Sequence, residues 1–411
     1  MSSDKINNKN GSVELTAECL CKANKFTSHV QRAELPLRAV YCHCDSCRHV
    51  TGAMHTSDIP WHGDGAAIHS AETLRRYAFS QRLGLLFCGT CGTPLFFETR
   101  VEGSAIHKYG VLTGVLANVD VKSLFKITDH IFVGDTLDGG ATPWFCDTND
   151  DGIERPRLWH GQMDQSELLE RPLVANSDAT VLAPSTDDKE NKSENEKDEI
   201  PIRCKCGGVD LVLRRPIADY ATKARPELPW FVDPVSNKSL GGFDACDSCR
   251  LSSGTDVFNW TFCLMQHLSF PTSGNDPFPQ STIELKKVVA APGSDRDSRW
   301  GTLTFYESSL DVQRYFCGRC SATVFYAADD RPEMVDLAIG LLWSQNGARA
   351  EELVSWDFGG KMVWRQDAVG GWRECFIERI EEAADRWRIQ RGLPKNWRRI
   401  QNEEAAKKER M

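Results

Sequence analysis

The chain has 411 residues, more than one ordinary hydrophobic core accommodates, so its length favours two or three domains. Hydrophobic residues make up 41% and charged residues 26%, and no apolar run is long enough for a transmembrane helix, so we expect no membrane span. A net charge of −9 speaks against general binding to phosphate backbones, and nucleic acid is therefore not expected as a partner.

The beginning of the chain indicates the compartment. Its first ten residues, MSSDKINNKN, lack the apolar stretch and the cleavage site of a secretory signal. We therefore expect a cytoplasmic protein, with the nucleus as the alternative. Cysteines stay reduced in both compartments, so the sixteen cysteines need a function other than disulfide formation.

Both halves of the chain are predicted to contain short strands. Short runs rich in β-branched and aromatic residues, bounded by Gly, Pro, Asp and Asn, predict small antiparallel sheets at residues 105–116, 126–133, 209–213 and 322–326. Residues 176–200 are mostly Asp, Glu, Lys, Asn and Ser without any aromatic residue, which predicts a disordered charged linker rather than a surface loop.

The end of the chain predicts a helix. Apolar residues recur there at helical spacing, at Phe376, Ile380, Ala383, Ala384 and Trp387. We predict one C-terminal helix with a basic tail over residues 376–411, and we expect its apolar side to pack against a core. A helix that binds a partner is the alternative.

The cysteines appear in the same order in both halves of the chain. The first half has Cys19 and Cys21, then Cys42, Cys44 and Cys47, then Cys88 and Cys91. The second half has Cys204 and Cys206, then Asp244, Cys246 and Cys249, then Cys317 and Cys320. The central sequence CDSCR is identical in both copies, and a glycine follows at the same distance, as Gly52 and Gly254. The chain is therefore predicted to contain two divergent copies of one module.

These spacings are typical of zinc ligands. Zinc binds thiolate sulfur at about 2.3 Å in a tetrahedron, and two cysteines separated by one or two residues supply half of such a site. The seven motif cysteines of the first half make one four-cysteine site and leave three. Three ligands with an open position are typical of a catalytic zinc.

Other interpretations of the cysteines remain open. The clusters could be buried free thiols or a redox pair, although no βαβ pattern supports a thioredoxin-like site. The three-cysteine site could be a second structural ion completed by His43 or His49, although His43 is expected on the opposite side of an extended chain. The three remaining cysteines, Cys146, Cys263 and Cys375, are interpreted as small core residues.

The motifs CHCDSCRHVTGA and FCGTCGTPLFF resemble the glutathione-dependent formaldehyde-activating enzyme family, often abbreviated GFA, which includes centromere protein V. The resemblance covers residues 13–150 and 201–375. It implies a mainly β fold, with two tandem Mss4-like (β-tent) zinc-binding domains followed by the C-terminal helix.

The resemblance also implies which cysteines share an ion. Two structural zinc ions are expected, one on Cys19, Cys21, Cys88 and Cys91 and the other on Cys204, Cys206, Cys317 and Cys320. The catalytic zinc of the family corresponds to Cys42, Cys44 and Cys47 in this sequence.

The implied reaction joins glutathione to formaldehyde or cleaves the carbon–sulfur bond of the adduct. A zinc ion with an open position suits this chemistry because it lowers the pKa of a bound thiol. We therefore expect a carbon–sulfur lyase acting on a small thiol adduct such as a glutathione conjugate, with its working centre in the first half.

Two departures from the family pattern limit the comparison. Asp244 replaces one cysteine in the second copy, so the fourth site, formed with Cys246 and Cys249, is expected to be weak, altered or empty. In the first copy, Lys22 and Ala23 stand where the second has a glycine pair, so its opening turn is expected to differ.

Arg48 and Arg250 are candidates for binding a substrate carboxylate, with a structural ion pair as the alternative. Gly52 and Gly254 are expected to form backbone turns.

Two further functions are considered. The chain could be a binding module in which zinc only stabilises the sheets. It could also have a chromatin or cytoskeletal function, which the acidic net charge disfavours and the basic tail after Trp387 leaves open.

Overall fold

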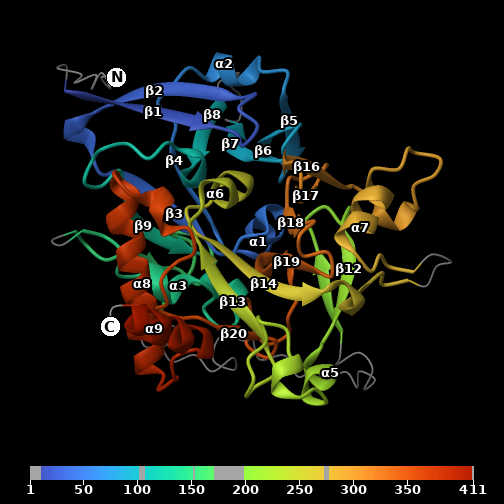
Figure 1. Ribbon diagram of the computed structural model, residues 1–411. Helices are drawn as coiled ribbons and strands as arrows, with labels where there is room; N and C mark the ends of the chain where they lie inside the picture. Colours follow the sequence, from blue (N-terminus) through green and yellow to red (C-terminus); the bar gives the residue numbers. More distant parts are fainter. Residues whose placement is uncertain (1–10, 101–106, 151–152, 171–198, 273–276, 410–411) are drawn as a thin grey trace, which may run out of the picture.

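The computed structural model describes residues 11–100, 107–150, 153–170, 199–272 and 277–409 (Figure 1). The predicted linker lies almost entirely outside these ranges, so its predicted disorder is not tested. No helix among the described residues is long and apolar enough to cross a membrane.

The first half is built mainly from strands. They are β1 Ser12–Glu18, β2 Lys25–Gln31, β3 Leu37–Cys42, β4 Thr56–Pro60, β5 Leu74–Ala78, β6 Leu83–Cys88, β7 Pro94–Arg100, β8 His107–Leu112, β9 Phe125–Ile131 and β10 Arg157–Leu158. Short helices connect them, namely α1 Asp45–Thr51, α2 Gly65–His69 and α3 Thr142–Phe145, with the 3-10 turns η1 Arg32–Glu34, η2 Thr113–Val115 and η3 Val133–Thr136.

The second half is also rich in strands. They are β11 Glu199–Arg203, β12 Asp210–Arg214, β13 Ser239–Asp244, β14 Phe258–Leu264, β15 Leu268–Ser269, β16 Leu303–Ser309, β17 Val312–Cys317, β18 Thr323–Ala328, β19 Met334–Ala338 and β20 Val354–Trp356. Its helices are α5 Ile217–Ala221, α6 Asp247–Ser253, α7 Thr282–Val289, α8 Trp372–Gln390 and α9 Trp397–Glu409. The 3-10 turns are η5 Arg225–Glu227, η6 Met265–His267, η7 Ser298–Trp300, η8 Ile339–Leu341 and η9 Arg365–Ala368.

Each half contains one large sheet, and the strand orders of the two sheets correspond. The eight-stranded sheet has the order β10-β9-β3-β4-β8-β7-β6-β5, and the seven-stranded sheet has the order β20-β13-β14-β19-β18-β17-β16. A smaller antiparallel sheet, β1-β2 or β11-β12-β15, accompanies each. The predicted strand runs are confirmed in β8, β9, β12 and β18.

The expected antiparallel pairing holds for most neighbouring strands, but the two large sheets are bigger than expected and are not wholly antiparallel. Strand β9 pairs in parallel with β3, and β20 pairs in parallel with β13. Each of these strands returns to the sheet after a long excursion through other elements, so no hairpin pattern in the sequence identifies its partner.

The strands form because their apolar residues alternate. In β1, Val13, Leu15 and Ala17 are buried while Glu14 is exposed, as expected for a strand with one face on the core. Buried residues from both halves belong to one continuous hydrophobic cluster, which includes Leu15 and Ile127 from the first half and Phe325 from the second. The two halves therefore share a core.

The C-terminal region forms two helices instead of the predicted one. Helix α8 buries Phe376, Ile380 and Trp387, which confirms the predicted apolar side. It ends near Gly392, whose φ of +65° lies outside the helical region, and Pro394 follows. Figure 1 shows α8 beside α3 and β9, so this end of the chain packs against the first half.

Candidate metal centres

Four clusters of metal-ligating side chains form at the predicted positions. Within each cluster, the candidate ligand atoms all lie within 4.8 Å of one another. The clusters are Cys19, Cys21, Cys88 and Cys91; Cys204, Cys206, Cys317 and Cys320; Cys42, Cys44 and Cys47; and Asp244, Cys246 and Cys249. The structure therefore brings together every residue that the sequence analysis proposed as a ligand.

The two four-cysteine clusters fit a tetrahedral zinc ion. The Sγ atoms of Cys19 and Cys21 are 3.5 Å apart, and those of Cys21 and Cys88 are 3.6 Å apart. The Sγ of Cys206 lies 3.5 Å from that of Cys204 and 3.5 Å from that of Cys317. Sulfurs about 2.3 Å from one ion are separated by about 3.8 Å in a tetrahedron, so the observed spacing is suitable for zinc.

Tight turns position these sulfurs. The amide of Asn24 donates to the Sγ of Cys19 at 3.2 Å, and the amide of Val209 donates to the Sγ of Cys204 at 3.2 Å. Lys22 has a φ of +63° and the equivalent Gly207 has a φ of +69°. The expected difference between the two opening turns was therefore wrong, because the lysine adopts the conformation that glycine adopts in the other copy.

Cys44 and Cys246 are the N-cap residues of helices α1 and α6. The Sγ of each accepts the backbone N–H of the last ligand of its cluster, Cys47 or Cys249, at 3.2 Å. Hydrogen bonds from Cys42 and Cys47, followed by the backbone amide, lower the pKa of the Cys44 thiol to about 3. The start of a helix stabilises a thiolate and thereby favours metal binding.

The histidines near the first three-cysteine cluster lie in the core. The Nε2 of His43 and the Nδ1 of His130 are 2.9 Å apart, and His55 stacks on Tyr41 with ring centroids 4.9 Å apart. Burial lowers the pKa of His43, and burial lowers that of His55 to about 3, so both rings are neutral. His43 thus faces the core, and the Nδ1 of His49 lies 2.9 Å from the carbonyl of Arg203.

The two arginines that follow the motifs are buried. Arg250 donates to two carbonyls of the first half, that of Gly114 and that of Leu116, the latter at 2.9 Å. It also pairs with Asp247 at 2.6 Å. Arg48 pairs with Asp45 and is 5% exposed. Their main contacts are therefore structural, in agreement with the alternative interpretation. Gly52 and Gly254 have φ of +79° and +76° and end α1 and α6, as expected for backbone turns.

The remaining three cysteines lie outside the clusters. Cys146 and Cys263 are buried, as expected. Cys375 is exposed, so its interpretation as a core residue was wrong. Its position follows from the helix, because Phe376 and Ile377, which follow it in α8, face the core instead.

The two three-ligand clusters have different surroundings. Asp58 pairs with Val40, which lies two residues before the first ligand Cys42. Trp260 pairs with Gly242, which lies two residues before the first ligand Asp244. Asp58 and Trp260 therefore occupy equivalent positions in the two halves. By the same comparison, Leu85 is equivalent to Arg314. Two further pairs follow, Phe97 with Tyr326 and Gly110 with Asp336.

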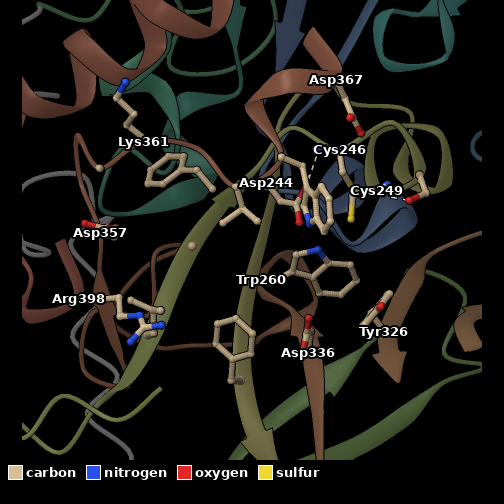
Figure 2. Close-up of a pocket in the computed structure, with 18 of the residues that line it drawn as sticks. Asp244, Cys246, Cys249, Trp260, Tyr326, Asp336, Asp357, Lys361, Asp367 and Arg398 are labelled. Atoms are coloured by element: carbon tan, nitrogen blue, oxygen red, sulfur yellow. Dashed lines mark hydrogen bonds between the residues drawn. The ribbon is translucent and has the colours of Figure 1, made fainter. Parts of the chain in front are cut away.

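A pocket of about 620 Å³ opens beside the cluster of the second half. Figure 2 shows Asp244, Cys246 and Cys249 on one side of it, with Trp260 and Tyr326 next to them. The sequence analysis missed the aromatic and charged residues of this pocket. They lie on strands and on loops near the end of the chain that no sequence motif marks. Alignment of the two copies by strand register identifies those on the strands.

The fold and the clusters define a mainly β protein with candidate zinc centres. Residues 14–135 match the model of a family described as glutathione-dependent formaldehyde-activating enzyme, so this part of the chain is similar to that family. The matched stretch contains all the cluster cysteines of the first half and none of the second. No curated protein and no solved structure matches the chain.

Proposed function

We propose that the chain is a zinc-dependent enzyme that forms or cleaves the carbon–sulfur bond of a thiol adduct, such as the adduct of glutathione and formaldehyde. In this proposal residues 13–150 and 201–375 are two copies of a module of the Mss4-like tent type, and the reaction takes place in the first. The observation that carries it is the cluster of Cys42, Cys44 and Cys47, three thiols within 4.8 Å of one another inside the matched segment.

Three thiolates leave one tetrahedral position for a substrate. When bound, zinc would supply an open coordination position and Lewis acidity that favours the thiolate form of a substrate thiol. Cys44 holds its sulfur at the start of α1 with the hydrogen bond from the Cys47 amide. The matching Asp244 makes the second cluster less suited to this task, because a carboxylate is a harder ligand than a thiolate.

Asp58 is proposed to accept the proton of the thiol. It lies on β4 on the same face of the sheet as Cys42, because side chains two residues apart on β3 share a face. Burial raises the pKa of Asp58 to about 6, so the carboxyl can take up and release a proton near neutral pH.

The proposed reaction is balanced without an oxidant or reductant. The sulfur forms a bond to the carbonyl carbon of the aldehyde, and the π electron pair of the carbonyl moves to its oxygen. The thiol releases one proton and this oxygen takes up one proton, so the protons balance. In the reverse direction the carbon–sulfur bond breaks and the same groups exchange the proton.

A Cys47→Ser substitution tests the proposal. We expect this variant to hold one zinc ion fewer than the wild-type chain and to form the glutathione–formaldehyde adduct at least about tenfold more slowly. Cys375→Ser is the matched control, because this cysteine is exposed and lies outside the clusters. Loss of the ion with unchanged activity would show that the first centre is not catalytic.

A further inference from the structure

The pocket beside the second three-ligand cluster has its own chemistry. Its lining combines metal-ligating atoms of Asp244, Cys246 and Cys249 with aromatic side chains. Three of these apolar side chains are unusually exposed for their size, with Trp230 at 45%, Val363 at 52% and Trp364 at 57%. Exposed apolar side chains gathered around a concave site are typical of a ligand-binding pocket.

A buried cation lies at the inner end of this pocket. Arg314 is 6% exposed, and its Nη1 lies 3.6 Å from the Sγ of Cys249 while its Nη2 donates to the Oγ of Ser248 at 2.8 Å. Its Nε is buried and has no hydrogen-bond partner among the described residues. A buried guanidinium N–H without an acceptor is unfavourable, so Arg314 retains unsatisfied hydrogen-bonding capacity next to the cluster.

The ring of Tyr326 holds this cation in place. Arg314 lies 4.9 Å from the centre of the ring and Arg331 lies 5.5 Å from it. Arg331 pairs with Asp336 at 3.0 Å, so its charge is neutralised within the protein. Arg314 therefore remains the cation that an anion at the cluster would meet.

The two centres differ in net charge once each holds a divalent ion. One carboxylate and two thiolates carry three negative charges, and a divalent ion together with Arg314 balances them. In the first half the three thiolates have Leu85 at the position of Arg314, so one negative charge is not balanced. An incoming anion is repelled less at the second centre.

We propose that this pocket binds a small organic anion with an aromatic body. The anionic group lies beside the cluster of Asp244, Cys246 and Cys249, next to Arg314, and the aromatic body packs against Trp260 and Trp364. The anion can be a thiolate or a carboxylate, since both accept a hydrogen bond from Arg314 and both are zinc ligands. The site is separate from the reaction centre proposed in the first half.

Figure 2 shows the residues that would surround such a ligand. Trp260 stands between the cluster and Asp336, while Lys361, Asp357 and Arg398 lie at the other side of the pocket. Trp260 is 4% exposed, so its ring forms a fixed wall. The anionic end of the ligand therefore points toward the cysteines and its aromatic body toward the pocket opening.

Titration calorimetry of the intact zinc-loaded chain tests this proposal. Phenylmethanethiol and phenylacetate are the probes, and acetate is the comparison without an aromatic body. We expect at least one aromatic probe to bind with a dissociation constant at least about tenfold lower than that of acetate. The two probes distinguish a sulfur anion from an oxygen anion as the preferred ligand.

Two variants locate the binding site. Arg314→Leu, which introduces the residue of the first half, is expected to weaken binding of the aromatic probe by about tenfold or more. Trp364→Ala removes an exposed side chain and is expected to weaken it severalfold without affecting the fold.

A third variant separates this proposal from the preceding one. Cys47→Ser, which removes the centre of the first half, is expected to leave the binding of phenylacetate unchanged. Failure of both aromatic probes to bind, or binding that neither Arg314→Leu nor Trp364→Ala weakens, would overturn the second site whatever the outcome for the enzymatic activity.

Discussion

At the scale of single residues, Asp58 and Trp260 give the two three-ligand centres different surroundings. They occupy equivalent positions on β4 and β14, as the strand register shows. The first centre thus has a carboxylate nearby, which suits proton transfer, and the second has an aromatic wall, which suits binding of an apolar body. The sequence motifs around the cysteines are too similar to predict this difference.

Replacement of the carboxylate should reduce the rate in the first centre. Asp58→Asn keeps the shape of the side chain and removes the proton acceptor, so the rate constant is expected to fall about a hundredfold. In the wild-type chain the ionised fraction of Asp58 decreases as the pH falls below about 6, the pKa of this group, and the rate is expected to decrease with it. Rate measurements between pH 5 and 8 check both expectations, and an unchanged pH profile in the variant would exclude Asp58 as the acceptor.

Lys22 adopts a backbone conformation that is unfavourable for a lysine. Its φ is +63°, and left-handed backbone destabilises a residue with a Cβ by about 1–2 kcal/mol. Glycine avoids this strain, but it loses more conformational freedom on folding than a residue with a Cβ, which costs roughly 0.5–1 kcal/mol of stability. We therefore expect Lys22→Gly to raise the free energy of unfolding by about 0.5–1 kcal/mol.

Urea denaturation of the zinc-loaded chain measures this change. Lys22→Ala is the control, because it also removes the exposed ion pair with Glu18 but keeps a Cβ. If the alanine variant gains as much stability as the glycine variant, the backbone conformation is not the cause.

At the scale of elements, two glycine contacts join the halves. The amide of Gly114, in η2, donates to the carbonyl of Gly254 at 3.0 Å, and the amide of Gly340, in η8, donates to that of Gly52 at 3.0 Å. Gly254 and Gly52 end α6 and α1, the helices that carry the motif cysteines. The position of each three-ligand centre is thus linked to the opposite half.

These contacts leave no space for a side chain. A Cβ on Gly114 would lie 2.2 Å from the backbone nitrogen of Thr255, and backbone atoms cannot move away without disturbing the end of α6. We expect Gly114→Ala to lower the free energy of unfolding by about 1–3 kcal/mol or more. Gly293→Ala, where a Cβ would meet nothing within 4 Å, serves as the control and should change it by less than about 0.5 kcal/mol. Equal midpoints of thermal unfolding for the two variants would contradict the importance of this contact.

The elements that the sequence predicted well are those with a local pattern. Cysteine spacing predicted the four clusters, and the helical periodicity of Phe376, Ile380 and Trp387 predicted the buried side of α8. The break before α9 was missed although Gly392 and Pro394 mark it. The parallel pairing of β9 and β20 and the pocket around Arg314 could not be predicted, because they depend on contacts between residues far apart in the chain.

At the scale of the whole molecule, the halves are joined by a buried polar network as well as by apolar residues. Arg373, from α8, pairs with Asp256 at 2.9 Å and donates to the carbonyl of Thr113 at 2.7 Å. The Oγ1 of Thr113 donates to Asp256 at 2.6 Å. Loss of one partner of a buried ion pair leaves the other charge without compensation, which is strongly destabilising. Separation of the halves would break this pair and is therefore unfavourable.

Cleavage of the chain between the halves should therefore leave them associated. A protease site inserted within residues 176–200 allows the zinc-loaded chain to be cut after it has folded. We expect the two fragments to elute together in size-exclusion chromatography under native conditions and to separate in denaturant. Elution as two separate folded fragments would show that the shared core contributes little to stability.

The central claim is that the clustered cysteines of both halves hold zinc. Native mass spectrometry of the intact chain, compared with Cys47→Ser, tests it most directly. The account predicts three firmly held zinc ions in the wild-type chain, a fourth, more weakly held ion on Asp244, Cys246 and Cys249, and one ion fewer in the variant. A chain that is fully folded and active without any bound metal would contradict the account.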